Sequence, residues 1–166
     1  MIWTIDTWLL VCANQKQDQT AACRDFLYSV LAEHLAALNQ EVLREYENKA
    51  LTSKSSFAAA WYSKMWSTGR LKPFFKPESG KAVNLRQRLE KNLPKAIHRF
   101  DPDDVPFVVL CFRTADKHLI SGDVGEGDFS PALTRWLKKE YRICFHDLRE
   151  AAPYHRARHR CTMERR

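Results

Sequence analysis

The residues from Asp101 to Phe129 constrain the fold most, because they place two groups of acids on either side of one short buried unit. Asp101 followed by Pro102 is typical of a helix start, where an N-cap carboxylate and a proline in the first turn are both favoured. The run 105–112 is apolar almost throughout and predicts a buried helix. His118–Ser121 then predicts a short buried strand that ends in a glycine turn.

This interpretation of the segment assigns positions to two carboxylates. Asp104 falls in the first turn of the helix, and Asp123 comes just after the strand. In a parallel α/β sheet the carboxyl ends of strands and the amino ends of helices lie at the same edge, where ligands bind. We therefore expect these two acids to face each other. The structural alternative is that capping explains Asp101, Asp103 and Asp104, and that a turn explains Asp123.

Length and composition favour one globular α/β domain. The chain has 166 residues, 45% of them hydrophobic, which is enough to bury a core without metal or disulfide staples. We expect a single domain over residues 1–150 and a basic C-terminal tail over residues 151–166. No apolar run approaches the ~20 residues that a membrane span requires. Alternating strand and helix patterns predict a short, mostly parallel central sheet.

The N-terminal segment and the cysteines point to the cytoplasm. Residues 1–15 are apolar, but they lack a basic start and carry Asp6, so we interpret them as a first strand and not as a signal peptide. Five cysteines include no CxxC pair, and Cys12, Cys111 and Cys144 lie in apolar segments, where free thiols behave as small hydrophobes. A reducing compartment fits this pattern.

The net charge of +7 is concentrated in two places. Between Lys54 and Arg99 there are eleven Lys and Arg against two Glu, and the tail adds five Arg after Tyr154. Basic segments beside an acidic pocket favour a polyanion held next to bound cations; the alternative for each segment is a solvated face. The candidates for contacting the backbone of such a polyanion are Arg70, Lys72, Arg86, Arg88 and Lys91.

Asp6 is the most informative single residue. It follows the strand-forming run Ile2–Ile5 and precedes further apolar residues. A carboxylate in such a run costs several kcal/mol unless it is paired, hydrogen-bonded or bound to a metal. The structural alternative is that Asp6 or Thr7 caps a following helix.

Periodicity and turn signals predict the remaining elements. They are a helix over 20–35, a strand over 35–38, a helix over 40–51 capped by Asn39, a helix from Ser53 or Ser55 to Trp66, a loop over 70–81, a helix over 83–97 bent near Pro94, a helix from Ser130-Pro131, and a strand over 142–145.

Two further features have open interpretations. Phe57, Trp61 and Met65 share one helix face, which is either core or a surface for a partner. In the tail, His155, His159 and Cys161 are close in sequence but lack a fourth zinc ligand at a standard spacing.

The order of acids resembles a PIN domain, the ribonuclease fold shared by VapC-type toxins and several RNA-processing nucleases. Asp6-Thr7 followed by two leucines is similar to the opening DTNxL of that family, and Glu45-Tyr46 is similar to its helical glutamate motif. The segment 101–107 is similar to a DPxDxxF variant, and 119–123 is similar to its LVTGD strand. The chain departs from the family at Trp8, where the family has Asn, and in a longer loop after Asp123.

The resemblance implies a three-layer α/β/α fold and metal-assisted hydrolysis of RNA. It implies Asp6, Asp104 and Asp123 as direct or water-mediated ligands of Mg²⁺ or Mn²⁺, because hard oxygen donors suit these ions. Glu45 is then a ligand or positions the attacking water. Thr7, Ser121 and Asp128 are expected as supporting residues, with Ser121 orienting Asp123 or a metal-bound water, and Asp128 as a further acid or a helix cap.

The resemblance also implies an antitoxin partner and homodimerisation through the first helices. Two other functions remain open at this stage. One is an RNA-binding or scaffold module with a degenerate site, against which the full set of four acids argues. The other is a structure-specific DNA nuclease of the flap type.

Overall fold

The computed structural model describes residues 1–16, 19–97, 99–125 and 128–148. Its centre is a five-stranded sheet in the order β3-β2-β1-β4-β5, and all four pairings are parallel. The strands are β1 (Ile2–Ile5), β2 (Leu35–Leu38), β3 (Leu71–Pro73), β4 (His118–Ser121) and β5 (Cys144–Asp147). The expected α/β class with a short parallel sheet is confirmed.

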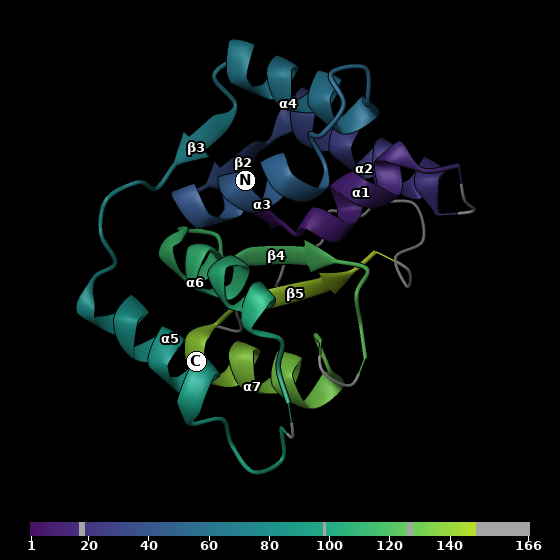
Figure 1. Ribbon diagram of the computed structural model, residues 1–166. Helices are drawn as coiled ribbons and strands as arrows, with labels where there is room; N and C mark the ends of the chain where they lie inside the picture. Colours follow the sequence, from purple (N-terminus) through teal and green to yellow (C-terminus); the bar gives the residue numbers. More distant parts are fainter. Residues whose placement is uncertain (17–18, 98, 126–127, 149–166) are drawn as a thin grey trace.

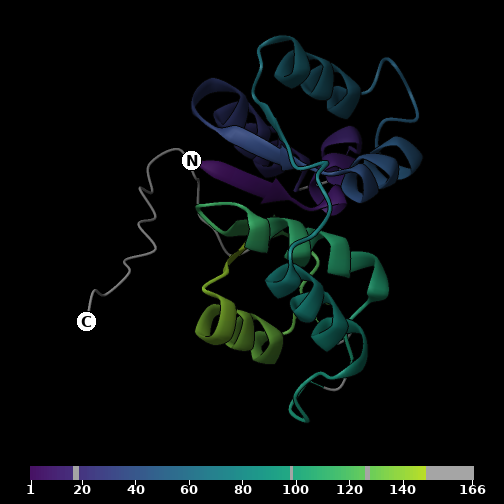
Figure 2. The same ribbon diagram turned by 90° about the vertical axis from the view of Figure 1, so that its left-hand side faces the viewer.

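Helices lie on both sides of the sheet and complete three layers (Figures 1 and 2). They are α1 (Thr7–Asn14), α2 (Thr20–Glu33), α3 (Gln40–Lys49), α4 (Phe57–Ser67), α5 (Gly80–Lys91), η1 (Pro102–Asp104), α6 (Val105–Arg113) and α7 (Pro131–Tyr141). Helices α1, α2 and α4 pack on one another. Helix α6 packs against β1, β2 and β4, with α3 and α5 in contact with it.

The central strand β1 explains how the sheet positions the acids. Trp3 pairs with Ala36 of β2 on one side and with His118 of β4 on the other. Residues from Trp3 to Thr7 are all buried, as expected for a strand enclosed by two neighbours and two helical layers. Because all pairings are parallel, the five strands run in the same direction, and their carboxyl ends lie at the same edge of the sheet.

Several predicted helix starts are confirmed, each by a side-chain cap. Asn39 Oδ1 accepts a hydrogen bond of 2.8 Å from the Val42 N–H at the start of α3. The Ser130 hydroxyl accepts one of 3.3 Å from the Leu133 N–H at the start of α7. These oxygens satisfy amide groups that have no partner inside the helix.

Other predicted boundaries were wrong for identifiable reasons. The segment 70–81 is not all loop, because Leu71–Pro73 forms the edge strand β3; Pro73 is tolerated there since an edge strand leaves one side unpaired. Helix α5 spans Gly80–Lys91 and ends before Pro94, which does not bend it. Ser56, and not Ser53 or Ser55, caps α4.

Two segments near the ends of the domain also differ from expectation. The N-terminal apolar segment is a strand only as far as Ile5, and its second half is helix α1. Strand β5 begins at Cys144 and not at Arg142, because Arg142 adopts a left-handed conformation with φ of 59° that ends α7.

Burial settles the two interpretations of the aromatic face on α4. Trp61 and Met65 are buried, and Phe57 packs partly buried against the core, so this face is core and not a free partner surface. Cys12, Cys23 and Cys111 are buried free thiols, as expected, whereas Cys144 is disulfide-bonded. Among the described residues, no helix is long and apolar enough to cross a membrane. The features predicted for the tail, including His155, His159 and Cys161, lie outside the described residues.

Candidate active site

Four acids from four elements gather at the carboxyl edge of the sheet. Asp6 lies between β1 and α1, Glu45 on α3, Asp104 at the junction of η1 and α6, and Asp123 two residues after β4. Asp6 interacts electrostatically with Glu45 and Asp123, and Asp104 interacts with Asp6 and Asp123. The structure thus brings together the acids that are separated by more than a hundred residues in the chain.

Ser121 links Asp6 and Asp123 directly. Its buried hydroxyl donates a hydrogen bond to the Asp6 carboxylate and accepts one of 2.9 Å from the Asp123 N–H. Both ends of the hydroxyl are therefore occupied, and its orientation is fixed. The last residue of β4 holds one acid by its side chain and the other by its backbone.

Asp6 occupies the N-cap position of α1, but capping does not account for its burial. Its carboxylate approaches the Trp8 N–H without forming a capping hydrogen bond of good geometry, and it is only 4% exposed. Burial, with the charges of Glu45 and Asp123, raises the pKa of Asp6 to about 6, although the hydrogen bond from the Ser121 hydroxyl and the nearby Trp8 N–H oppose the rise. A buried carboxyl with a raised pKa is typical of a functional site that binds another charged group.

Asp104 is also unexplained by capping. Asp101 caps η1, because its Oδ1 accepts a hydrogen bond of 2.9 Å from the Asp103 N–H, while Asp104 makes no capping hydrogen bond. Burial, and to a lesser extent the charges of Asp6, Asp101, Asp128 and Asp123, raise the pKa of Asp104 to about 8. Without a cation, Asp104 is mostly protonated at neutral pH.

Asp128 belongs to the same electrostatic group. Burial and the charge of Asp123 raise its pKa, and it in turn raises the pKa of Asp104. Its side chain caps no helix in the structure; Ser130 caps α7 instead. Of the two roles expected for Asp128, the acid fits these contacts.

Two further residues of α3, Lys49 and Tyr46, hold Glu45 and β1 in place, and sequence reasoning did not single out Lys49. Lys49, one turn along α3, approaches Glu45 at 3.3 Å and Asp103 at 3.6 Å. Tyr46 is buried, and its hydroxyl donates a hydrogen bond of 2.5 Å to the Ile5 carbonyl, just before Asp6. An i,i+4 search around Glu45 would have found Lys49. No local signal in the sequence predicts the contact between Tyr46 and β1.

Trp8 packs on the turn that carries Asp123. A Cβ atom added to Gly122 would lie 2.3 Å from the Trp8 ring, so only glycine fits between Ser121 and Asp123. This contact pins the first loop where the family has Asn. Thr7 is buried beside Asp6, and its hydroxyl has no hydrogen-bond partner among the residues that the structure describes.

The donor set fits a hard divalent cation. All the acids offer carboxylate oxygens, which suit Mg²⁺ or Mn²⁺. The raised pKa values of Asp6 and Asp104 indicate that the site lacks a positive charge. The Thr7 hydroxyl, which has no partner among the described residues, indicates that it also lacks a polar contact. Within the described ranges, no three His, Cys, Asp or Glu side chains form a group that could hold a metal ion as they stand. Bridging waters, which Mg²⁺ usually keeps, or side-chain rotation would be needed.

The five residues expected to contact an RNA backbone differ in whether their charges are free to do so. Arg86 is enclosed by carboxylates, at 2.6 Å from Glu41 and 2.5 Å from Glu78, so its charge is already neutralised. Arg70 donates a hydrogen bond of 3.2 Å to a backbone carbonyl at the end of α2. The remaining candidates, Lys72, Arg88 and Lys91, are exposed.

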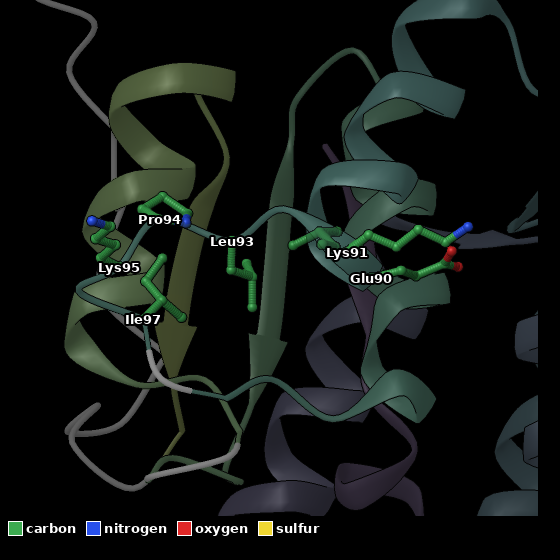
Figure 3. Close-up of a pocket in the computed structure, with 7 residues that line it drawn as sticks. Glu90, Lys91, Leu93, Pro94, Lys95 and Ile97 are labelled. Carbon is green, nitrogen blue, oxygen red and sulfur yellow. The ribbon is translucent and has the colours of Figure 1, made fainter.

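A pocket near the end of α5 lies apart from the acids. Figure 3 shows Glu90, Lys91, Leu93, Pro94, Lys95 and Ile97 around it, and its volume is about 380 Å³. None of the four candidate acids lines it. Its basic residues belong to the segment that the sequence identified as a candidate for binding a polyanion.

Comparison with known proteins supports the fold. No protein-family model and no curated protein sequence matches the chain. The chain is similar to one in the crystal structure of VapBC2 from Rickettsia felis bound to a DNA fragment from their promoter, with a TM-score of 0.54 and 16% identity. The match covers 89% of this chain and 98% of that chain. At this identity the likeness shows a shared PIN-like fold and nothing finer.

Proposed function

We propose that this protein is a metal-dependent endoribonuclease that hydrolyses phosphodiester bonds in RNA. The observation that carries the proposal is the electrostatic coupling of two acids, the buried Asp6 and the partly buried Asp104, at the carboxyl edge of a parallel sheet. That edge is where α/β folds bind ligands. Capping does not account for either side chain.

In this proposal Asp6, Asp104 and Asp123 hold Mg²⁺ or Mn²⁺, directly or through water. A bound ion of this kind lowers the pKa of a coordinated water and stabilises negative charge on a phosphate. Asp6 and Asp104 supply the negative charge that attracts the ion, and both must lose their protons when it binds. Divalent metal binding is therefore expected to weaken as the pH falls below about 8.

The other residues of the site position these acids. Ser121 fixes the Asp6 carboxylate and the backbone of Asp123. Glu45 is close enough to raise the pKa of Asp6, and we assign it to ligation or to orienting the attacking water. Lys49 holds Glu45 at 3.3 Å and restricts its side chain. Residues of this kind typically contribute 10- to 100-fold to metal affinity or activity.

We further propose that the nuclease is the toxin of a toxin–antitoxin pair and acts in the cytoplasm. One neighbour of similar fold comes from VapBC2 bound to a promoter DNA fragment, and the sequence resembles VapC-type toxins. An antitoxin would need a surface other than the face of Phe57, Trp61 and Met65, which is core. Co-purification of the chain with the product of a neighbouring gene, with inhibition of cleavage, would test this part separately.

Cleavage of matched oligonucleotides tests the function. We expect purified protein to cleave a labelled single-stranded RNA in Mg²⁺ or Mn²⁺ and not in chelator. Asp6→Asn and Asp104→Asn should each abolish cleavage, while Asp103→Asn, an exposed neighbour, should retain it. Preferential cleavage of the matched DNA strand or of a flap would make the protein a DNA nuclease. RNA binding without cleavage under any metal would make it a degenerate binding module.

A further inference from the structure

Helix α7 carries a stripe of basic side chains that no part of the acidic site uses. Arg135, Lys138 and Lys139 lie at i, i+3 and i+4, so they share one face of the helix, and Arg142 follows at its C-cap. All four are exposed. We call these four residues the α7 stripe; Glu140 is the one acid within α7.

The charges of the α7 stripe are not neutralised by the protein. Arg86 and Lys49 sit within 4 Å of carboxylates. Among the described residues, by contrast, none of the four stripe residues forms an ion pair. A row of unpaired cations on one face is the electrostatic footprint of a polyanion site.

A second group of cations and rings lies on another face of α7, between Trp136 and Tyr141. The Arg88 guanidinium of α5 lies 5.1 Å from the Trp136 ring centroid and donates a hydrogen bond of 2.9 Å to the Tyr141 hydroxyl. Lys117 donates one of 3.1 Å to the Tyr141 carbonyl. Neither cation has a carboxylate partner in the parts of the chain that the structure describes. Ring contacts fix Arg88 in place without cancelling its charge.

The position of α7 connects this surface to the acids. The helix begins directly after the loop of Asp123 and Asp128, where the Ser130 N–H donates a hydrogen bond of 2.8 Å to the Asp128 carbonyl. From the C-terminus of α7 the chain returns to the start of β5, at the edge of the sheet where the strands begin, opposite the acids (Figure 1). The stripe covers seven residue steps from Arg135 to Arg142, which is roughly 10 Å at about 1.5 Å per residue.

We propose that the α7 stripe binds the phosphate backbone of a single RNA strand and leads it to the acidic site. The proposal rests on the proposed function and adds the surface that holds its substrate. The stripe has the width of one helix face, which matches the width of one nucleic-acid backbone. Contacts of this kind position a strand without reading its sequence.

An anionic membrane is the competing ligand for a basic helix, and the surface argues against it. Helices that lie on membranes present large apolar side chains beside their cations. The exposed large hydrophobic residues within the described ranges are Met1, Tyr28, Trp66, Phe75 and Val83, and none of them lies on α7.

Fluorescence anisotropy of a labelled single-stranded RNA, measured in chelator, tests the assignment without cleavage. The variant is Lys138→Gln with Lys139→Gln. Its matched control is Lys54→Gln with Lys64→Gln, two exposed lysines in and beside α4, which Figure 1 shows at the opposite end of the molecule. Thermal melting and circular dichroism confirm that both variants fold.

We expect the α7 variant to bind about 25-fold more weakly at 0.1 M salt, since each phosphate contact is worth about fivefold there. Its slope of log affinity against log salt should fall by about 1.4. The control should bind within about twofold of wild type. Equal binding by the α7 variant, or an equal loss in the control, would overturn the assignment.

Two further outcomes separate this inference from the proposed function. If wild type cleaves RNA with metal and the α7 variant binds it unchanged, the surface is wrong and the nuclease stands. If RNA binds through α7 but no metal yields cleavage, the nuclease is wrong and the surface stands. Vesicles containing phosphatidylserine complete the set: loss of vesicle binding in the variant, with RNA binding unchanged, would make the stripe a membrane surface.

Discussion

Replacing Asp104 with Asn should stabilise the protein when no metal is present. The pKa of Asp104 rises from 3.8 to about 8 on folding, so the folded state must keep a proton that the unfolded chain releases. This carboxyl therefore costs nothing below pH 3.8, and its cost grows with pH up to about 8 and is constant above. Asparagine cannot ionise, which removes the cost.

The size of the effect follows from the linkage between protons and folding. From 3.8 to pH 7, at about 1.4 kcal/mol per pH unit, the cost reaches about 4 kcal/mol. Asp104 is partly accessible, and solvent screening lowers this to about 2 kcal/mol. For a chain of this length, 1 kcal/mol shifts the melting temperature by roughly 2–4 °C, so we expect a gain of at least about 4 °C.

Urea and thermal unfolding in chelator, from pH 4 to pH 9, measure this gain. The gain for Asp104→Asn should be largest near pH 8 and vanish near pH 4, and saturating Mg²⁺ should reduce it by stabilising only the wild type. Asp103→Asn is the control, because that side chain is 73% exposed, and its effect should stay within about 0.5 kcal/mol. An Asp104→Asn variant no more stable than wild type at pH 8, or a gain unchanged at pH 4, would refute the reasoning.

Three other substitutions test the supporting contacts. Ser121→Ala removes the hydrogen bond to Asp6, and we expect metal-dependent cleavage to fall about 10- to 100-fold with the fold intact, as judged by circular dichroism. Gly122→Ala places a Cβ 2.3 Å from the Trp8 ring and should cost about 1–3 kcal/mol in urea unfolding; a second change, Trp8→Ala, should recover part of that loss. Tyr46→Phe leaves a β1 carbonyl without its donor and should cost about 1 kcal/mol, and an unchanged unfolding midpoint would contradict that contact.

The sequence predicted the parts of the fold that depend on local chemistry. Asn39 and Ser130 cap helices where expected, and the buried runs of β1 and β4 became central strands. It did not predict β3, whose three residues contain a proline and pair only because β2 offers a free edge. That pairing is a tertiary contact and leaves no periodic signal in so short a segment.

The sequence predicted which acids come together, and it did not predict their contacts. The cost of burying a carboxylate singled out Asp6 in its apolar run, whereas Asp104 was predicted from its place in the first turn of a helix at the sheet edge. The sequence could not assign Arg86 to Glu41 and Glu78, since that ion pair joins separate elements. It also did not single out the α7 stripe, whose four cations stand out only once their shared face is seen to be exposed and unpaired.

Calorimetric titration of Mn²⁺ into the protein at pH 7, in buffers of different ionisation enthalpy, tests the central claim most directly. With pKa values of about 8 for Asp104 and about 6 for Asp6, the metal-free site holds close to one proton at pH 7. The account predicts saturable binding with release of about one proton, lost in Asp104→Asn. Absence of saturable binding, or binding unchanged in an Asp6→Asn, Asp104→Asn double variant, would contradict it.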